Sequence, residues 1–181
     1  MPQQLFWCVE WHAELGSTME RASELAAAGA PSGTVVVADF QSQGRGTHGR
    51  VWHAQSGSCL MFTILLRPEI ELERLTELPQ RVAGSLSDFV RDEFGFSPTV
   101  KMPNDILVDG KKLCGVLCSS RVTGKRLDWV LCGVGLNTWM DVDGLPLDTA
   151  TSLALEGVAE IPAHPELLEM VLGQLEWLRE L

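Results

Sequence analysis

Apolar residues along this chain fall into runs of two kinds, and the two patterns predict different elements. Dense apolar stretches, several of them rich in β-branched residues, indicate buried strands. These stretches cover residues 5–11, 34–40, 58–66, 113–121 and 127–136. Apolar residues recurring every three or four positions indicate amphipathic helices. This second pattern is clear in residues 79–94 and 165–181, and a third helix is expected over residues 19–28.

Turn residues between these segments indicate how the strands pair. Two further short strands are predicted at residues 99–102 and 106–108, and Asp109-Gly110 directly after them is a strong hairpin signal. The turn Thr123-Gly124-Lys125 separates the last two long strands. Hairpins pair strands antiparallel, and no repeat or linker interrupts the pattern. We therefore expect residues 1–181 to form a single α/β (α+β) domain with a mixed, largely antiparallel sheet and flanking helices.

Composition and charge narrow the classes of partner. The 181 residues are 45% hydrophobic and 21% charged, which is ordinary for a globular protein. Fourteen Lys and Arg oppose 24 Asp and Glu, for a net charge of −10, which disfavours nucleic-acid binding. No apolar run reaches the roughly 18 residues of a membrane span, and residues 1–10 lack a basic segment before an apolar one, so we expect neither a membrane nor a secretory role.

The five cysteines form an odd set without any C-x-x-C pair. Most lie inside apolar stretches. This pattern favours reduced, buried cysteines in a cytoplasmic protein over a disulfide framework or a zinc site.

Residues 41–52, Gln-Ser-Gln-Gly-Arg-Gly-Thr-His-Gly-Arg-Val-Trp, form the least ordinary segment. Glycines let backbone N–H groups approach an anion, and arginine adds bidentate contacts. The composition fits an anion-binding loop and a flexible surface loop equally well. The segment matches G-x-G-x-x-G by letter, but no helical pattern follows it, so it is not a dinucleotide fingerprint.

Three other segments carry polar groups that suit chemistry. Lys101-x-Pro103-Asn104-Asp105 combines a cation, an amide and a carboxylate, and a carboxylate near an anion loop can hold Mg²⁺; the alternative is a strand-ending turn. Strand alternation sends Lys111 and Lys112 to opposite faces of the sheet. Gly133-Val134-Gly135-Leu136-Asn137 provides small residues on which a flat ligand can lie, or marks a bulge.

Together these segments resemble the motifs of biotin protein ligases, in the same order along residues 15–155. The matching segments are Ser17-Thr18, the glycine–arginine loop with Gln41 and Trp52, Lys101-x-Pro103-Asn104-Asp105, Gly110-Lys111-Lys112-Leu113-Cys114-Gly115, Gly133-x-Gly135-Leu136-Asn137, and Ala150-Thr151-Ser152-Leu153. The resemblance implies the biotin/lipoate ligase catalytic fold, similar to class II aminoacyl-tRNA synthetases. It also implies a chain without the N-terminal DNA-binding domain and the C-terminal barrel of some relatives.

The resemblance implies two-step chemistry with ATP and Mg²⁺. Biotin and ATP would give biotinyl-5′-adenylate, and the biotinyl group would then pass to a lysine of a biotin carboxyl carrier domain. The resemblance also makes a homodimer of this chain possible.

Roles for individual residues follow from the same resemblance. Catalytic residues would be Lys112, Arg45 and Asp105, with Asp105 also a candidate Mg²⁺ ligand. Residues expected to hold biotin or its adenylate are Ser17, Thr18, Met19, Gln41, Gly44, Arg45, Gly46, Thr47, Lys112 and Gly115. Residues expected to contact ATP or adenine are Trp52, Lys101, Asn104 and Asn137.

The chain departs from the family pattern at three positions. Thr47 stands where an arginine is usual, Met102 where a tryptophan is usual, and Ser119 where glutamate is frequent. Thr47 removes a cation from the loop that would cover the adenylate, so we expect that cover to be weaker.

Two other functions remain open at this stage. A lipoate or octanoate ligase or transferase shares the fold, and a transferase needs a nucleophilic cysteine that faces a lysine. Cys114 lies two residues after Lys112, so alternation along a regular strand would place both on one face. A non-catalytic biotin-binding module is the other alternative.

Overall fold

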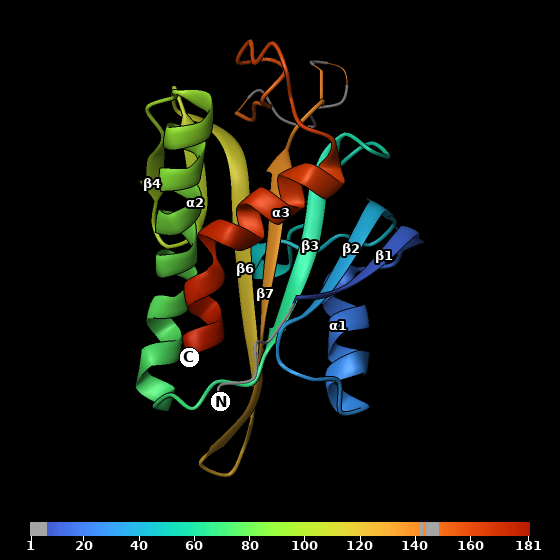
Figure 1. The fold of residues 1–181 in the computed structure, drawn as a ribbon, viewed down its shortest axis with the longest axis vertical. Helices are drawn as coiled ribbons and strands as arrows, with labels where there is room; N and C mark the ends of the chain where they lie inside the picture. Colours follow the sequence, from blue (N-terminus) through green and yellow to red (C-terminus); the bar gives the residue numbers. More distant parts are fainter. Residues whose placement is uncertain (1–6, 142, 144–148) are drawn as a thin grey trace.

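A computed structural model of the chain describes residues 7–141, 143 and 149–181. Within this part, seven strands form one sheet in the order β1-β2-β3-β7-β6-β5-β4 (Figure 1). The strands are β1 (Cys8–Leu15), β2 (Thr34–Gln41), β3 (Cys59–Leu66), β4 (Thr99–Lys101), β5 (Asp105–Val108), β6 (Lys111–Thr123) and β7 (Arg126–Asn137). β1 pairs with β2 in parallel, and the other neighbours pair antiparallel. The expected mixed, largely antiparallel sheet is confirmed.

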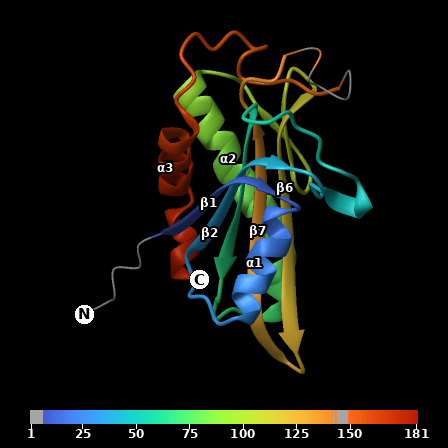
Figure 2. The same cartoon turned by 90° about the vertical axis from the view of Figure 1, so that its right-hand side faces the viewer.

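Helices cover both faces of this sheet. The α-helices are α1 (Thr18–Ala27), α2 (Leu78–Phe94) and α3 (His164–Gln174), with 3-10 turns η1 (Thr47–Gly49), η2 (Leu72–Glu77) and η3 (Glu176–Glu180). Figure 2 shows α1 on one side of the strands and α2 with α3 on the other. The end of the chain is therefore α3 followed by η3, and not one helix over residues 165–181 as expected.

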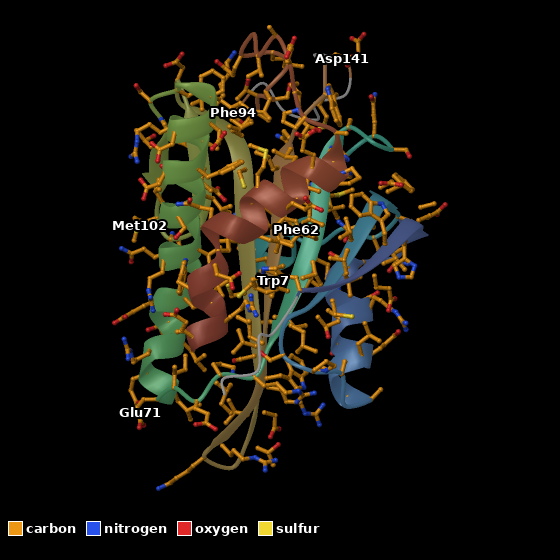
Figure 3. All side chains as sticks on the ribbon, viewed as in Figure 1. Trp7, Phe62, Glu71, Phe94, Met102 and Asp141 are labelled. Atoms are coloured by element: carbon orange, nitrogen blue, oxygen red, sulfur yellow. The ribbon has the colours of Figure 1, made fainter. Side chains whose placement is uncertain are left out.

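Side-chain alternation on the central strands feeds two separate apolar layers. Val35 and Val37 of β2 pack with α2 and α3, whereas Val36 packs with Ala22 of α1. Phe62 of β3 is fully buried in the larger layer and lies near α3 in Figure 3. Burying both faces explains why these strands read as continuous apolar runs.

The first strand differs from its expected bounds because its pairing partner extends it. Residues 5 and 6 of the predicted strand 5–11 lie outside the described part. β1 continues to Leu15 because its backbone pairs with β2 as far as Gln41. Polar residues of this edge strand therefore belong to the sheet, although they lie outside the apolar run.

β6 contains one extra residue where it pairs with β5. Ile106 pairs with Cys114 and Leu107 with Lys112, so Leu113 has no partner on β5. Such a bulge interrupts the alternation of side chains and redirects those that follow it. The bulge therefore decides which face of the sheet Lys112 occupies.

None of the helices in the described part is both long and apolar enough to cross a membrane.

Candidate functional site

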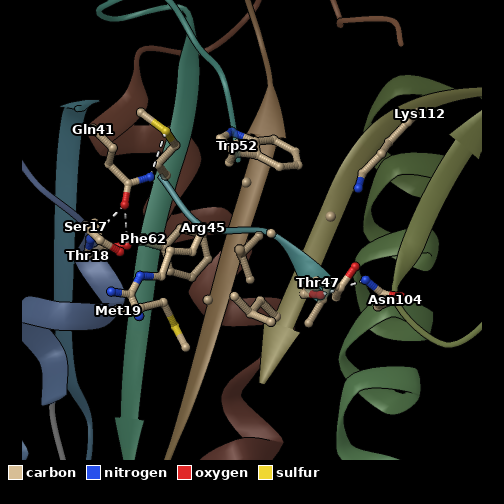
Figure 4. A pocket seen from close by; sticks show the side chains of 18 residues that line it. Ser17, Thr18, Met19, Gln41, Arg45, Thr47, Trp52, Phe62, Asn104 and Lys112 are labelled. Atoms are coloured by element: carbon tan, nitrogen blue, oxygen red, sulfur yellow. Dashed lines mark hydrogen bonds between the residues drawn. The ribbon is translucent and has the colours of Figure 1, made fainter. Parts of the chain in front are cut away.

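A cavity opens on the α1 side of the sheet, over β3, β7 and β6 (Figure 4). We call it the first cavity. It is lined by Ser17, Thr18, Met19, Gln41, Arg45, Gly46, Thr47, Trp52, Met61, Phe62, Asn104, Lys112, Gly115, Val116, Leu117, Gly133, Val134 and Gly135.

Glycines of β6 and β7 form the floor of the first cavity. A Cβ at Gly135 would lie 2.6 Å from Cζ2 of Trp52, and one at Gly115 would lie 2.9 Å from Cζ3 of the same ring. A Cβ at Gly133 would lie 2.8 Å from Sδ of Met19. The floor is therefore tightly covered, and the indole of Trp52 packs on Gly115 and Gly135.

Polar groups gather at one end of the first cavity. Oε1 of Gln41, at the end of β2, accepts hydrogen bonds from the backbone N–H of Thr18 at 2.7 Å and from its hydroxyl at 3.1 Å. The hydroxyl of Thr63, on β3, donates to Thr18 Oγ1 at 2.9 Å. Ser17 Oγ is buried and has no hydrogen-bond partner among the described residues. A buried hydroxyl without a partner is costly, so this end is suited to a polar group of a ligand.

Thr63 and Met61 were not anticipated from the sequence. Thr63 is fully buried, and the Sδ of Met61 lies 3.1 Å from Nε2 of Gln41. Both residues lie inside the apolar run 58–66, where one threonine and one methionine gave little indication of a role. The signal that could have found them is their common face with the glycine floor, which requires the register of β3 against β7.

The glycine–arginine loop closes on itself beside the cavity. Gly46 N–H donates to the Arg50 carbonyl at 2.7 Å, and Trp52 N–H donates to the Gly44 carbonyl at 2.9 Å. A Cβ at Gly44 would lie only 2.5 Å from the Trp52 carbonyl oxygen, so this position requires glycine. The sequence therefore folds here into a compact loop that carries Trp52 onto the cavity floor.

Two arginines of this loop have partners at its surface. The Arg45 guanidinium forms an ion pair with Glu20 of α1 and is 58% exposed at the mouth of the first cavity. The Arg50 guanidinium donates to the Thr47 carbonyl at 3.2 Å and to the Thr47 hydroxyl at 2.9 Å. Arg50 therefore lies against Thr47, one of the positions at which the sequence departs from the motif that it resembles.

A second cavity adjoins the first and shares Gly46, Thr47, Trp52 and Lys112 with it. Its other lining residues are Arg50, Val51, His53, Lys101, Asp105, Leu107, Gly110, Asn137, Met140, Thr149 and Ala150. Three cations and one carboxylate line it among the described residues. This surplus of positive charge suits an anionic ligand, in a chain whose net charge is negative.

Lys112 stands between the two cavities. Its Nζ lies 2.8 Å from Asp105 Oδ1, a close ion pair without hydrogen-bond geometry. The same Nζ lies 5.1 Å from the centre of the Trp52 ring, within cation–π range. Lys112 can therefore reach a charged group that spans both cavities.

Two predicted contacts with ATP are occupied by the protein itself. Asn137 Nδ2 donates to the Thr151 carbonyl at 2.8 Å and to the Lys112 carbonyl at 3.4 Å. Asn104 Nδ2 donates to the Val116 carbonyl at 3.1 Å, and its backbone N–H donates to the Lys101 carbonyl at 3.3 Å. Asn104 lines the first cavity, whereas Lys101 lines the second. Both amides hold neighbouring backbone segments in place around the site.

Cys114 does not face the site. It is 1% exposed, in the apolar layer against α2 and α3, and burial raises the pKa of its thiol to about 12. The expectation that Cys114 and Lys112 share a face is wrong, because Leu113 is the extra residue of the bulge. Met102, another departure from the family pattern, is 55% exposed and outside both cavities.

The fold and the site define a domain with one cavity that is polar at one end and a second, adjoining cavity lined by a surplus of cations among the described residues. Residues 13–137 match the family described as the biotin/lipoate A/B protein ligase family. The chain belongs to this family.

Individual relatives show the same relationship. The chain is 38% identical over 147 residues to the bifunctional ligase/repressor BirA of Bacillus subtilis, covering 80% of this chain and 45% of BirA. It is 32% identical over 176 residues to the biotin--[acetyl-CoA-carboxylase] ligase of Mycobacterium tuberculosis, covering 91% of this chain and 61% of that protein. The biotin protein ligase of Aquifex aeolicus, solved with biotin and ATP, superposes with a TM-score of 0.78 at 31% identity, covering 96% of this chain and 70% of that one. The chain thus spans about half the length of these curated relatives.

Proposed function

We propose that this chain is the catalytic domain of a biotin protein ligase that activates biotin with ATP. The observation that carries the proposal is the pair of adjoining cavities, which share Lys112 and Trp52. Biotin would occupy the first cavity, with its ureido ring at Ser17, Thr18 and Gln41. The nucleotide would occupy the cationic second cavity. Similarity to the Aquifex aeolicus enzyme, which was solved with both molecules, supports this assignment.

The first step would join two anions, and the cations of the site suit that task. A carboxylate oxygen of biotin attacks the α-phosphorus of ATP, the bond to the β-phosphate oxygen breaks, and pyrophosphate leaves. Lys112, between the cavities, would neutralise the charge that grows on the α-phosphoryl oxygens. Arg45 would turn inward from Glu20 and hold the carboxylate against the phosphate.

In the second step an amine of the acceptor would attack the acyl carbon of biotinyl-adenylate. The C–O bond to AMP breaks, and the nitrogen loses a proton. We propose a lysine of a biotin carboxyl carrier domain as the acceptor. The name of the Mycobacterium tuberculosis relative, which specifies acetyl-CoA carboxylase, supports this class of partner.

The side chains of the site can hold Mg²⁺ only together with the phosphates of the nucleotide. Among the residues that the structure describes, no three His, Cys, Asp or Glu side chains converge on one point. Within the described part of the chain, Asp105 is the one carboxylate at the second cavity, and its Oδ1 lacks a hydrogen bond. Mg²⁺ commonly takes one carboxylate together with phosphate oxygens, so these residues fit a Mg²⁺ ion that arrives with ATP and neutralises its phosphates.

The site favours this function over acyl transfer from a thioester. A transferase would need a thiolate at the lysine, but Cys114 lies in the apolar layer on the other side of the sheet. The polar end formed by Ser17, Thr18 and Gln41 is also unsuited to the end of a linear acyl chain.

Pyrophosphate exchange into ATP tests the proposal directly. Exchange that depends on biotin and not on octanoate supports the biotin ligase. Exchange that depends on octanoate indicates a lipoate ligase, and biotin binding without exchange indicates a non-catalytic module.

The proposal also covers the location and the partners of the protein. We propose a cytoplasmic protein, since all five cysteines are free thiols. A homodimer and the absence of nucleic-acid binding stay as proposals, and sedimentation with and without duplex DNA tests both.

A further inference from the structure

Two cysteines outside the ligand cavities face each other across neighbouring strands. Cys118 of β6 and Cys132 of β7 are direct antiparallel partners. The Cys118 thiol points at the sulfur of Cys132, with 3.6 Å between the two sulfurs. The mechanism proposed above uses neither residue.

The backbone is already arranged for a bond between them. Directly opposed residues of antiparallel strands have Cα atoms about 4.5–5.5 Å apart, which lies inside the range of about 4.4–6.8 Å seen in disulfides. A disulfide needs the sulfurs about 2 Å apart, so rotation of the two side chains and a small approach of the strands would suffice.

The two thiols also differ in accessibility. Cys132 is fully buried in the layer under α2 and α3, whereas Cys118 is partly exposed. The contact with Cys118, together with burial, raises the pKa of the Cys132 thiol well above its ordinary range. Cys118 is therefore the sulfur that a reagent from solvent reaches first, and Cys132 lies behind it, within reach of the Cys118 sulfur.

We infer that Cys118 and Cys132 form a reversible disulfide when the protein meets a hydroperoxide. The Cys118 sulfur attacks the outer peroxide oxygen, the O–O bond breaks, and an alcohol or water leaves as Cys118 becomes a sulfenic acid. The Cys132 sulfur then attacks the Cys118 sulfur, the S–O bond breaks, and the Cys132 proton leaves with the hydroxyl as water. Two thiols lose two electrons, and the peroxide gains them.

The same strands form the floor of the first cavity, so the bond would reach the ligand. Leu117 and Gly133 are the adjacent cross-strand pair and both line that cavity. A Cβ at Gly133 would already lie 2.8 Å from Sδ of Met19, so this part of the floor has no free space. Drawing the strands together beneath it would disturb a fitted ligand. This consequence rests on the proposed biotin site, but the disulfide does not.

Peptide mapping tests the disulfide. Arg121, Lys125 and Arg126 lie between the two cysteines, so trypsin separates them unless a disulfide joins the peptides. The reduced protein is treated with hydrogen peroxide, blocked with N-ethylmaleimide and digested. We expect a dithiothreitol-sensitive linked pair of peptides that carries Cys132.

Matched variants identify the partner. Cys114 lies on the same tryptic peptide as Cys118. The link should persist in Cys114→Ala and disappear in Cys118→Ser. Exposed Cys8 reports whether the peroxide acted at all. Oxidised Cys8 without a linked pair, or a link that survives in Cys118→Ser, would overturn the inference.

Biotin affinity measured on the oxidised and reduced protein tests the effect on the site. We expect about tenfold weaker binding after oxidation, restored by dithiothreitol, because the floor at Leu117 and Gly133 would shift beneath the ligand. Equal biotin affinity in the two forms would refute the effect of the disulfide on the biotin site, but it would not refute the disulfide itself. Failure of the reduced protein to bind biotin would contradict the proposed function instead, and the peptide map would still decide the disulfide.

Discussion

Lys112 and Cys114 are two residues apart on β6, but their side chains lie on opposite faces of the sheet. Lys112 reaches Asp105 at 2.8 Å between the two cavities, whereas Cys114 is buried against α2 and α3. The extra residue Leu113 causes this separation, because it breaks the pairing with β5 between them. A single bulge thus puts the cation at the site and removes the thiol from it.

Lys112→Ala should abolish most adenylate formation without unfolding the domain. Losing one charged contact in a phosphoryl-transfer site should raise the barrier by roughly 2–4 kcal/mol, or about thirtyfold to a thousandfold in rate. Lys111 is exposed and lines neither cavity, so Lys111→Ala is the matched control and should be nearly silent. Equal pyrophosphate exchange by the two variants would refute the assignment of Lys112.

Thr63→Val should weaken biotin binding while the Michaelis constant for ATP stays unchanged. The Thr63 hydroxyl donates to Thr18 Oγ1, which leaves the Thr18 proton directed at Gln41. Without this donor the Thr18 hydroxyl can rotate, at a cost of about 1 kcal/mol or roughly fivefold in Kd.

Two further variants separate this positioning effect from general destabilisation. Thr63→Ser keeps the hydroxyl and should restore the affinity. Thr34 is another buried threonine, and its hydroxyl bonds only to the nearby Pro31 carbonyl among the described residues. Calorimetric biotin affinities that fall equally in Thr63→Val and Thr34→Val would contradict a positioning role for Thr63.

Thr47→Arg should slow the escape of biotinyl-adenylate. A charge-assisted contact at the edge of the cover would contribute about 1.5 kcal/mol, which is roughly tenfold in dissociation rate. The natural protein should accordingly release adenylate early and label lysines on proteins other than the carrier domain.

Arg50 provides the competing explanation, because its guanidinium already contacts Thr47. If Arg50 completes the cover, Thr47→Arg will leave adenylate retention unchanged and Arg50→Ala will shorten it. Dissociation of radiolabelled adenylate from the three proteins decides between these outcomes.

Acid should destabilise the fold through His164, at the start of α3. Burial lowers the pKa of His164, with a smaller opposite effect from Asp39. Its Nε2 lies 2.9 Å from the Thr138 hydroxyl. Since the imidazole protonates less readily when folded, its neutral form contributes full stability above the unfolded pKa of about 6.5, and this contribution falls as pH drops below that value.

Unfolding temperatures at pH 8 and pH 5 for the natural protein and His164→Gln measure this effect. The natural protein should lose more stability between the two pH values than the variant does. An identical loss in both would show that His164 does not titrate on unfolding in this range.

Much of this protein is readable from local sequence. The apolar runs and turn residues place the strands and helices because backbone preference and burial act over a few residues. The glycine–arginine loop and Lys101-x-Pro103-Asn104-Asp105 mark the site for the same reason, since close backbone approach requires glycine at positions such as Gly44. Both segments line the two cavities, but by themselves their residues left a loop or a turn as the alternative, and the expected chemistry came from the resemblance of all the motifs together.

Relationships between strands could only come from the tertiary structure. Counting alternate residues assumes an uninterrupted ladder, and the bulge at Leu113 violates that assumption between Lys112 and Cys114. The amide of Asn137 is used by the Thr151 carbonyl, and Cys118 meets Cys132 across 14 positions of sequence. These contacts depend on which strands are neighbours and in what register, which is set by packing the whole sheet between its helices.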